Sequence, residues 1–158
     1  MKVLFVCSGN VFRSQIAEAF FGKYTKKNHS GSAGVNAKSL HHAGRALKEE
    51  CPLAVQLMAE DGIDVSKNHS KQLTKTMTRA ADLVVSLTST DDLPSYVKEE
   101  KKLMVWRVTD PEPPDSSKLS QPIQSWTKES IGRANYLFFR ERRDQIRANV
   151  MKLIEEIG

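Results

Sequence analysis

The chain has 158 residues, of which 39% are hydrophobic and 27% charged, a composition that fits one folded domain (1–158) and excludes a disordered or fibrous protein. No apolar run is long enough to cross a membrane, and the short run after Lys2 lacks the length of a signal peptide, so we expect a cytoplasmic protein without membrane association. The net charge of +5 favours anionic ligands, but no zinc-finger, aromatic RNA-binding or helix-turn-helix pattern makes nucleic acid the expected partner.

Four short stretches predict the strands of a sheet. They are residues 3–6, 32–35, 83–85 and 103–106. Residues 3–6 and 83–85 are short, apolar and β-branched, and turn-forming residues bound them. Helical patterns lie between these stretches, and this alternation predicts a parallel sheet with helices on both faces.

Apolar residues at helical spacing predict the helices. After the first strand, one helix face is formed by Ile16, Ala17, Phe20 and Tyr24. Pro52 should start a helix rather than lie inside one, so the segment 43–58 is expected to form two helical pieces. The stretch 111–122 contains four prolines and is expected to be a loop.

A long amphipathic helix is predicted from about Ile131 to the C-terminus. Its apolar positions recur at helical spacing, so it should pack on the sheet. Its polar face carries Arg140, Arg142, Arg143 and Arg147. We interpret these arginines as a solvated face.

The first strand ends at Cys7, and Arg13 follows six residues later at the start of a helical pattern. In a parallel sheet this turn lies at the carboxyl edge, where ligands bind. The backbone N–H groups of the turn and the helix N-terminus can converge on one oxyanion. The planar guanidinium of Arg13 can donate hydrogen bonds to two oxygens of the same anion. Because Gly9 has no side chain, the backbone can curl close to the anion, and Asn10 tolerates a left-handed conformation. The predicted anion site comprises Ser8, Gly9, Asn10, Val11, Phe12 and Ser14, with Cys7 and Arg13 as catalytic residues.

Cys7 is the expected nucleophile of this site. The chain has two cysteines, and a reducing compartment keeps both as thiols. A helix N-terminus and a nearby arginine stabilise a thiolate, and Ser14 can donate a hydrogen bond to the sulfur. The other cysteine, Cys51, is interpreted as structural.

The motif VCSGNVFRS resembles the phosphate loop of the low-molecular-weight protein tyrosine phosphatases and of the arsenate reductases that share their fold. The resemblance covers nearly the whole chain, through SAGV (32–35), residues 52–74, ADLVVSLT (81–88) and DP (110–111). It implies a flavodoxin-like three-layer α/β sandwich with a four-stranded parallel sheet. It also implies a two-step hydrolysis through a cysteinyl-phosphate on Cys7, with no metal and no cofactor.

The same resemblance implies further site residues. Asp110 matches the general acid of the family, and Pro111 restricts it to an extended conformation. Its carboxyl group would protonate the leaving oxygen and then activate water. Asn10, Ser32 and His69 match the residues that support the loop.

Several positions bear on the substrate. Phe12 replaces a common second cysteine, Gln15 replaces a proline and is expected to alter only the entry to the helix, and Glu112 replaces a tyrosine that packs on aromatic substrates. Val11 stands where protein-arginine phosphatases have threonine, and it fits an aryl ring better than a guanidinium. The relay cysteines of many arsenate reductases are absent, so arsenate reduction would need an external thiol such as glutathione or mycothiol.

The sequence therefore predicts a cysteine-dependent phosphatase that acts on phosphotyrosine in proteins or on small aryl phosphates. The alternative is an arsenate reductase that uses an external thiol. A protein-arginine phosphatase and a non-catalytic anion-binding module are further possibilities. The expected partner is a phosphotyrosyl protein or a small phosphate or oxyanion, and the expected state is a monomer or weak dimer.

Overall fold

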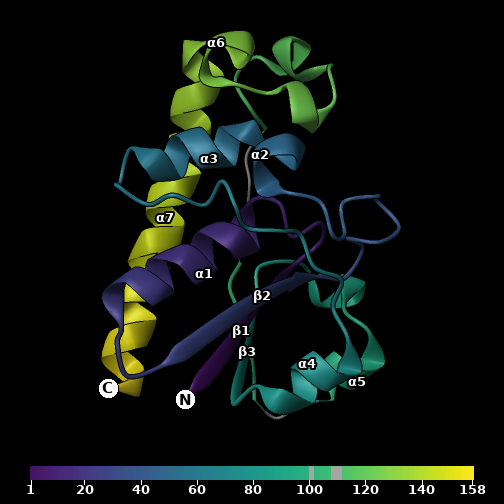
Figure 1. Ribbon diagram of the computed structural model, residues 1–158, viewed down its shortest axis with the longest axis vertical. Coiled ribbons are helices and arrows are strands. Elements are labelled where there is room, and N and C mark those ends of the chain that lie inside the picture. The colour runs from purple at the N-terminus through teal and green to yellow at the C-terminus, as the bar shows by residue number, and fades with distance from the viewer. Residues whose placement is uncertain (100–101, 108–111) are drawn as a thin grey trace.

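A four-stranded parallel sheet lies between two layers of helices, as the sequence predicts (Figure 1). The computed structural model describes residues 1–99, 102–107 and 112–158. The strands are β1 (Lys2–Cys7), β2 (His29–Gly34), β3 (Leu83–Ser86) and β4 (Leu103–Val105), in the spatial order β2-β1-β3-β4. Because β1 lies between β2 and β3, its last residue is at the middle of the carboxyl edge of the sheet.

The helices are divided between the two faces. One face is covered by α1 (Arg13–Tyr24) and α7 (Arg133–Ile157), and α2 (Leu47–Glu50) and α3 (Pro52–Ala59) pack on the same core beyond the carboxyl edge of the sheet (Figure 1). The other face carries α4 (Lys75–Ala80) and α5 (Ser95–Lys98). The short α6 (Lys128–Ile131) precedes α7, and the 3-10 helices are η1 (Thr90–Asp92), η2 (Ser116–Leu119) and η3 (Ile123–Ser125). The two pieces predicted in segment 43–58 are α2 and α3, and Pro52 is the first residue of α3, as predicted.

Successive side chains of β1 enter opposite halves of the core. Phe5 belongs to the cluster formed with α1, α3 and α7, whereas Leu4 and Val6 pack with residues of α4 and α5. Side chains of a strand alternate between the faces of a sheet, and here both faces are covered. The continuous apolar run of residues 3–6 follows from this double burial.

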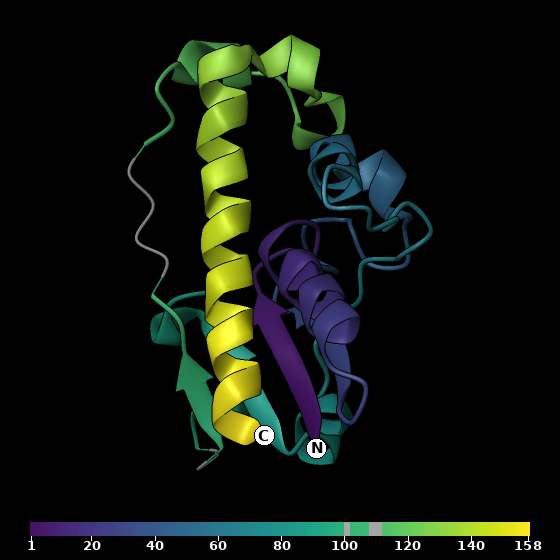
Figure 2. The same ribbon diagram turned by 90° about the vertical axis from the view of Figure 1, so that its left-hand side faces the viewer.

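Helix α7 runs along the length of the molecule, and its first half extends beyond the sheet toward α2, α3 and α6 (Figure 2). Its later turns bury Ile146, Val150 and Leu153 in the same core as β1 and α1. The predicted long amphipathic helix is therefore confirmed. Among the residues that the structure describes, no helix is long and apolar enough to cross a membrane.

The prediction that the arginines of α7 form a solvated face is wrong for Arg143. Its side chain is buried, its Nη1 donates to the carbonyl oxygen of Leu57 at 2.8 Å, and its Nε lies 3.3 Å from Oδ2 of Asp61. Arg147 approaches the other oxygen of Asp61 at 3.2 Å. These contacts tie α7 to the end of α3, which a pattern read along one helix does not reveal.

The proline-rich stretch is not entirely a loop. The part of it that the structure describes contains η2, a short 3-10 helix. The backbone N–H of Asp115 donates to Oδ1 of Asn135 at 3.0 Å, and Nδ2 of Asn135 donates back to the Asp115 carbonyl at 2.7 Å. This reciprocal pair fastens the stretch to the first turn of α7.

Candidate active site

The segment from Cys7 to Arg13 connects the end of β1 to the start of α1, where the sequence places it. Its first residues are hydrogen-bonded to the segment that follows β2. The backbone N–H groups of Val35 and Asn36 donate to the carbonyl oxygens of Cys7 and Ser8, both at 2.9 Å. Gly34 lies against this turn. A Cβ atom at Gly34 would be 2.6 Å from the Ser8 carbonyl oxygen, so only glycine lets the loop lie this close to β2.

Asn10 is the centre of the loop. It adopts φ 57°, the left-handed conformation that the sequence predicts for it, and its side chain is fully buried. Its Oδ1 accepts hydrogen bonds from the backbone N–H of Lys71 at 2.8 Å and from Nε2 of Gln15 at 3.1 Å. Because two donors face this oxygen, the orientation of the amide is determined, and Nδ2 points to Oγ of Ser14 at 2.8 Å.

The sulfur of Cys7 lies 2.9 Å from the hydroxyl oxygen of Ser14. That oxygen already accepts a hydrogen bond from Asn10, so the hydroxyl proton of Ser14 is available to the sulfur. The predicted contact between Ser14 and Cys7 is therefore present. A hydrogen bond of this kind stabilises a negatively charged sulfur when the thiol loses its proton.

Arg13 begins α1, and its guanidinium reaches the carboxyl edge of β3. Nη1 donates a hydrogen bond to the carbonyl oxygen of Leu87, which anchors one edge of the planar group. Arg13 also lines a hollow of about 360 Å³ together with Ser89 and Arg107. Arg13 and Arg107 therefore line one hollow, which lies at the carboxyl ends of β3 and β4.

Gln15 does more than alter the entry to the helix, so that prediction is wrong. The side chain is buried, and its Nε2 lies 3.2 Å from the Asn10 carbonyl oxygen and 3.0 Å from the His69 carbonyl oxygen, in addition to its contact with the Asn10 side chain. One amide thus joins the loop to the segment around His69. A proline at this position would lack all of these hydrogen bonds.

The supporting residues expected from the resemblance are only partly confirmed. Asn10 holds the loop as described above. The hydroxyl of Ser32 instead donates to the carboxylate of Glu18 in α1, and the His69 side chain is exposed, so His69 supports the loop through its backbone carbonyl. Both differences come from the way the neighbouring segments pack against α1.

Other contacts of the loop were not foreseen from the sequence. The hydroxyl of Ser70 donates to the carbonyl oxygen of Gly9 at 2.9 Å. His42 packs against Gly9, with Cδ2 3.2 Å from where a Cβ of that glycine would be, and its Nδ1 lies 3.8 Å from Glu50. Glu50 is buried and also pairs with Arg45 at 3.0 Å. These partners are 29 or more residues from the loop in the chain, and no local motif indicates them.

The remaining predicted residues lie in different surroundings. Ser8 accepts a hydrogen bond from Nδ2 of Asn36 at 3.2 Å. Val11 is buried in the core, so its role as a surface for an aryl ring finds no support in this arrangement. Phe12 is half-buried, and its ring packs on Phe139 of α7 with the centroids 5.8 Å apart. Asp110, the predicted general acid, lies outside the described residues.

Cys51 is the second cysteine of the chain, and both cysteines are free. It is fully buried at the start of α3, and this burial raises the pKa of its thiol to about 12. A thiol with such a pKa stays protonated at neutral pH and is a poor nucleophile. The structural interpretation of Cys51 agrees with this environment.

Comparisons with known proteins identify the family of the chain. A family model described as low molecular weight phosphotyrosine protein phosphatase matches residues 2–158. The probable low molecular weight protein-tyrosine-phosphatase EpsP of Ralstonia solanacearum is 36% identical over 83 residues, and this match spans about half of each protein, 52% in both cases. Arsenate reductase 2 of Staphylococcus haemolyticus is 33% identical over 115 residues, covering 69% of this chain and 77% of the reductase.

Solved structures show the same fold. A low molecular weight protein tyrosine phosphatase from T. tengcongensis has a TM-score of 0.68 at 24% identity and covers 99% of both chains. The YwlE arginine phosphatase from Geobacillus stearothermophilus has a TM-score of 0.64 at 24% identity, with 99% of this chain and 92% of that chain covered. At these identities the likeness concerns the fold alone, and it confirms the predicted four-stranded architecture.

Proposed function

Because the chain belongs to the low molecular weight phosphotyrosine protein phosphatase family, whose members are enzymes, we propose that it is a cysteine-dependent phosphatase acting on phosphotyrosine in proteins or on small aryl phosphates. The observation that carries the proposal is the connected set of hydrogen bonds from Gln15 through Asn10 and Ser14 to the sulfur of Cys7. It holds a reactive atom at the strand-to-helix turn where backbone amides can surround an oxyanion.

In the first step the Cys7 thiolate attacks phosphorus. A sulfur–phosphorus bond forms, and the bond from phosphorus to the leaving oxygen breaks. The loop amides and Arg13 hold the non-bridging oxygens, whose charge they stabilise as the bonds change. The carboxyl group of Asp110 gives its proton to the leaving oxygen, so the product leaves as a neutral phenol.

In the second step the Asp110 carboxylate takes a proton from water, and the water oxygen attacks phosphorus. The sulfur–phosphorus bond breaks, inorganic phosphate leaves, and the thiolate of Cys7 is restored. Ser14 stabilises this departing sulfur through the same hydrogen bond that it makes before the reaction. Asp110 regains its proton and is ready for another cycle.

Arsenate reduction with an external thiol is the second candidate. It is supported by the 33% identity to a staphylococcal arsenate reductase over 69% of this chain. Residues 86–92 read SLTSTDD and contain no cysteine, so a relay of oxidation through this segment would have no thiol to use. The oxidised product would then have to be resolved by glutathione or a similar thiol.

A substrate panel tests the proposal. Phosphate release is measured from p-nitrophenyl phosphate, a phosphotyrosyl peptide and a phosphoarginyl peptide, and arsenite formation is measured with arsenate and glutathione or mycothiol. We expect release from the first two substrates. Arsenite formation without phosphate release would identify a reductase, release from phosphoarginine alone would identify an arginine phosphatase, and no turnover of any substrate would contradict an enzymatic role.

Gln15→Leu is expected to lower kcat by about 10- to 100-fold, because the Asn10 amide loses one of the two donors that orient it and Ser14 is no longer held toward the sulfur. The free energy of unfolding should fall by about 2 kcal/mol, since three buried acceptor contacts are lost. Steady-state kinetics and urea unfolding measure the two effects.

Gln121→Leu is the matched control, because it removes the same amide from an exposed position. It should change kcat less than twofold. If Gln15→Leu lowers stability but kcat per folded molecule and the inhibition constant of inorganic phosphate stay as in the wild type, Gln15 has no positioning role.

A further inference from the structure

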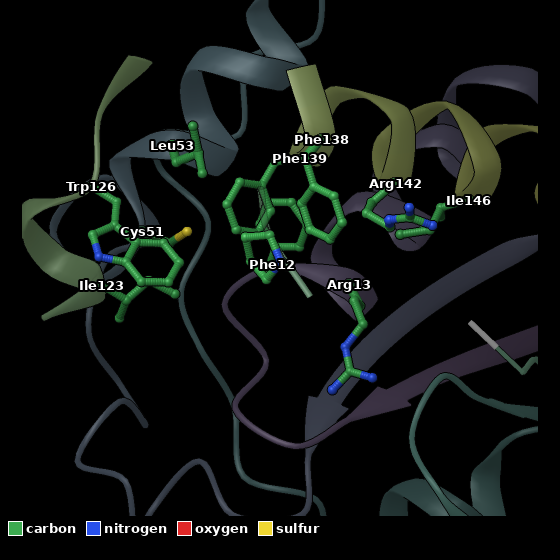
Figure 3. A pocket seen from close by; sticks show the side chains of 11 residues that line it. Phe12, Arg13, Cys51, Leu53, Ile123, Trp126, Phe138, Phe139, Arg142 and Ile146 are labelled. Atoms are coloured by element: carbon green, nitrogen blue, oxygen red, sulfur yellow. The ribbon is translucent and has the colours of Figure 1, made fainter. Parts of the chain in front are cut away.

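A cavity of about 370 Å³ adjoins the phosphate loop (Figure 3). It lies among α1, α3, α7 and the stretch that leads into α6, and its lining is mainly apolar. The side chains that matter here are Phe12, Ile123, Trp126, Phe138 and Phe139. Cavities of about 300 to 1,000 Å³ with aromatic linings are the usual binding sites of small molecules.

Aromatic rings form a continuous wall in this cavity. The Phe139 ring contacts three others, with centroid distances of 5.8 Å to Phe12, 5.6 Å to Trp126 and 5.3 Å to Phe138. The guanidinium of Arg142 lies 4.6 Å from the Phe138 ring centroid, so the apolar wall ends at a positive charge. Aromatic side chains at these separations favour a flat aromatic ligand, which adds further ring contacts.

The buried thiol of Cys51 supports the apolar character of the cavity. It lines the cavity, and because burial raises its pKa to about 12, it contributes no charge at neutral pH. In Figure 3 the thiol lies beside Trp126 and Leu53, on the opposite side of the central phenylalanine rings from Arg142. The cavity therefore has an uncharged end and an end with a cation.

The cavity is also lined by residues that are close in sequence to the two proposed reacting groups. Phe12 and Arg13 are consecutive residues of the phosphate loop, and both line it. On another side it is lined by Pro113, three residues after the proposed acid Asp110. In an in-line reaction the leaving oxygen lies between the nucleophile and the acid, so the carbon skeleton of the leaving group has to emerge near these two segments.

We propose that this cavity binds the leaving group of an aryl phosphate that is larger than one ring, such as a bicyclic aromatic, while its phosphoryl group occupies the loop above Cys7. The inference rests on the proposed function and specifies its substrate class. The wall is supplied by residues 113–126 and by the first half of α7, which extends beyond the sheet (Figure 2). Arg142 would face the rim of the aromatic system and favour electron-rich rings.

Kinetics with two substrates test the subsite. The Michaelis constants KM for phenyl phosphate and for 2-naphthyl phosphate are compared in the wild type, in Phe138→Ala and in Ile123→Ala. Each replacement is expected to raise the naphthyl-to-phenyl ratio of the KM values about 5- to 10-fold, because the second ring loses its contacts. KM does not depend on the fraction of folded enzyme, so partial misfolding does not imitate this effect.

Met151→Ala is the control on the same helix, because Met151 is exposed and is not one of the residues that line the cavity. The ratio should stay within twofold of the wild-type value in this variant. An equal ratio in the wild type, Phe138→Ala and Ile123→Ala would overturn the subsite, even if hydrolysis itself depends on Cys7.

A binding measurement covers the case in which the protein hydrolyses neither substrate. The chain has two tryptophans, so a spectrum of the ¹⁵N-labelled protein contains two indole N–H signals, and Trp106→Phe assigns the signal of Trp126. In Cys7→Ser, 2-naphthyl phosphate should shift the Trp126 signal in a saturable way, and Phe138→Ala should weaken this binding about 5- to 10-fold.

The two measurements separate failure of the subsite from failure of the proposed function. Saturable binding at Trp126 without hydrolysis would keep the subsite and contradict the phosphatase. Hydrolysis without any shift of the Trp126 signal, and with an unchanged KM ratio, would keep the phosphatase and contradict the subsite. An absence of both hydrolysis and binding would overturn both inferences.

Discussion

Cys7→Ser is expected to abolish phosphate release, with kcat/KM for p-nitrophenyl phosphate falling at least about 10⁴-fold. Ser14 and the Asn10 network present a hydrogen bond to a sulfur that can carry a negative charge. A serine hydroxyl at the same position keeps its proton at neutral pH, and it is a much weaker nucleophile. Phosphate release and single-turnover formation of a phosphoenzyme measure the effect.

Cys51→Ala is the matched control because it removes the other thiol of the chain. It should keep phosphate release within about tenfold of the wild type, since a buried thiol with a pKa of about 12 takes no part in the chemistry. Iodoacetate should label Cys7 and leave Cys51 unmodified, and inorganic phosphate should slow that labelling. Substantial turnover by Cys7→Ser would exclude a cysteinyl-phosphate intermediate.

Asp110→Asn is expected to lower kcat for phenyl phosphate by about 10²- to 10⁴-fold. Phenolate is a poor leaving group, so its departure depends strongly on a proton from the acid. The loss should be much smaller for p-nitrophenyl phosphate, because p-nitrophenolate leaves without protonation. Comparing kcat for the two substrates in the same variant therefore tests the acid role independently of folding.

Asp115→Asn is the control for this replacement. Asp115 is in the same stretch of chain, and its carboxylate accepts a hydrogen bond from Ser117 and pairs with Lys118. Asp115→Asn should leave the ratio of kcat for p-nitrophenyl phosphate to kcat for phenyl phosphate as in the wild type. If Asp110→Asn also leaves that ratio unaltered, the proton donor is another carboxyl group. Glu112, Asp91 and Asp92 are then the candidates, together with Asp115 if its own replacement changes the ratio.

The fold was predictable because its signals are local. The apolar run of residues 3–6 indicates a strand buried on both faces, and the glycine and asparagine after Cys7 indicate the turn into α1. Pro52 marks the start of α3 because proline is favoured in the first helical turn. Each of these signals concerns residues that are close together in the chain.

The contacts that support the loop were not predictable in the same way. The side chain of Gln15 is hydrogen-bonded to the backbone of His69, 54 residues away, and that of Ser70 to the backbone of Gly9, 61 residues away. Arg143 is bonded to Leu57 across 86 residues, and an amphipathic pattern places it on the polar face of its helix without showing what covers that face. Such partners depend on how separate elements pack, and a polar side chain has many possible partners before packing selects one.

The sequence by itself determined the four-stranded parallel sheet, the turn with Cys7 and Arg13 at its carboxyl edge, and the family, because backbone preferences and motif spacing are properties of short segments. Only the tertiary structure decided that Gln15 joins the loop to the segment at His69, that Val11 is buried, and that Phe12 belongs to an aromatic cavity formed with α7 and the stretch before it. These relations join segments far apart in the chain, so they exist only when the helices are packed against the sheet.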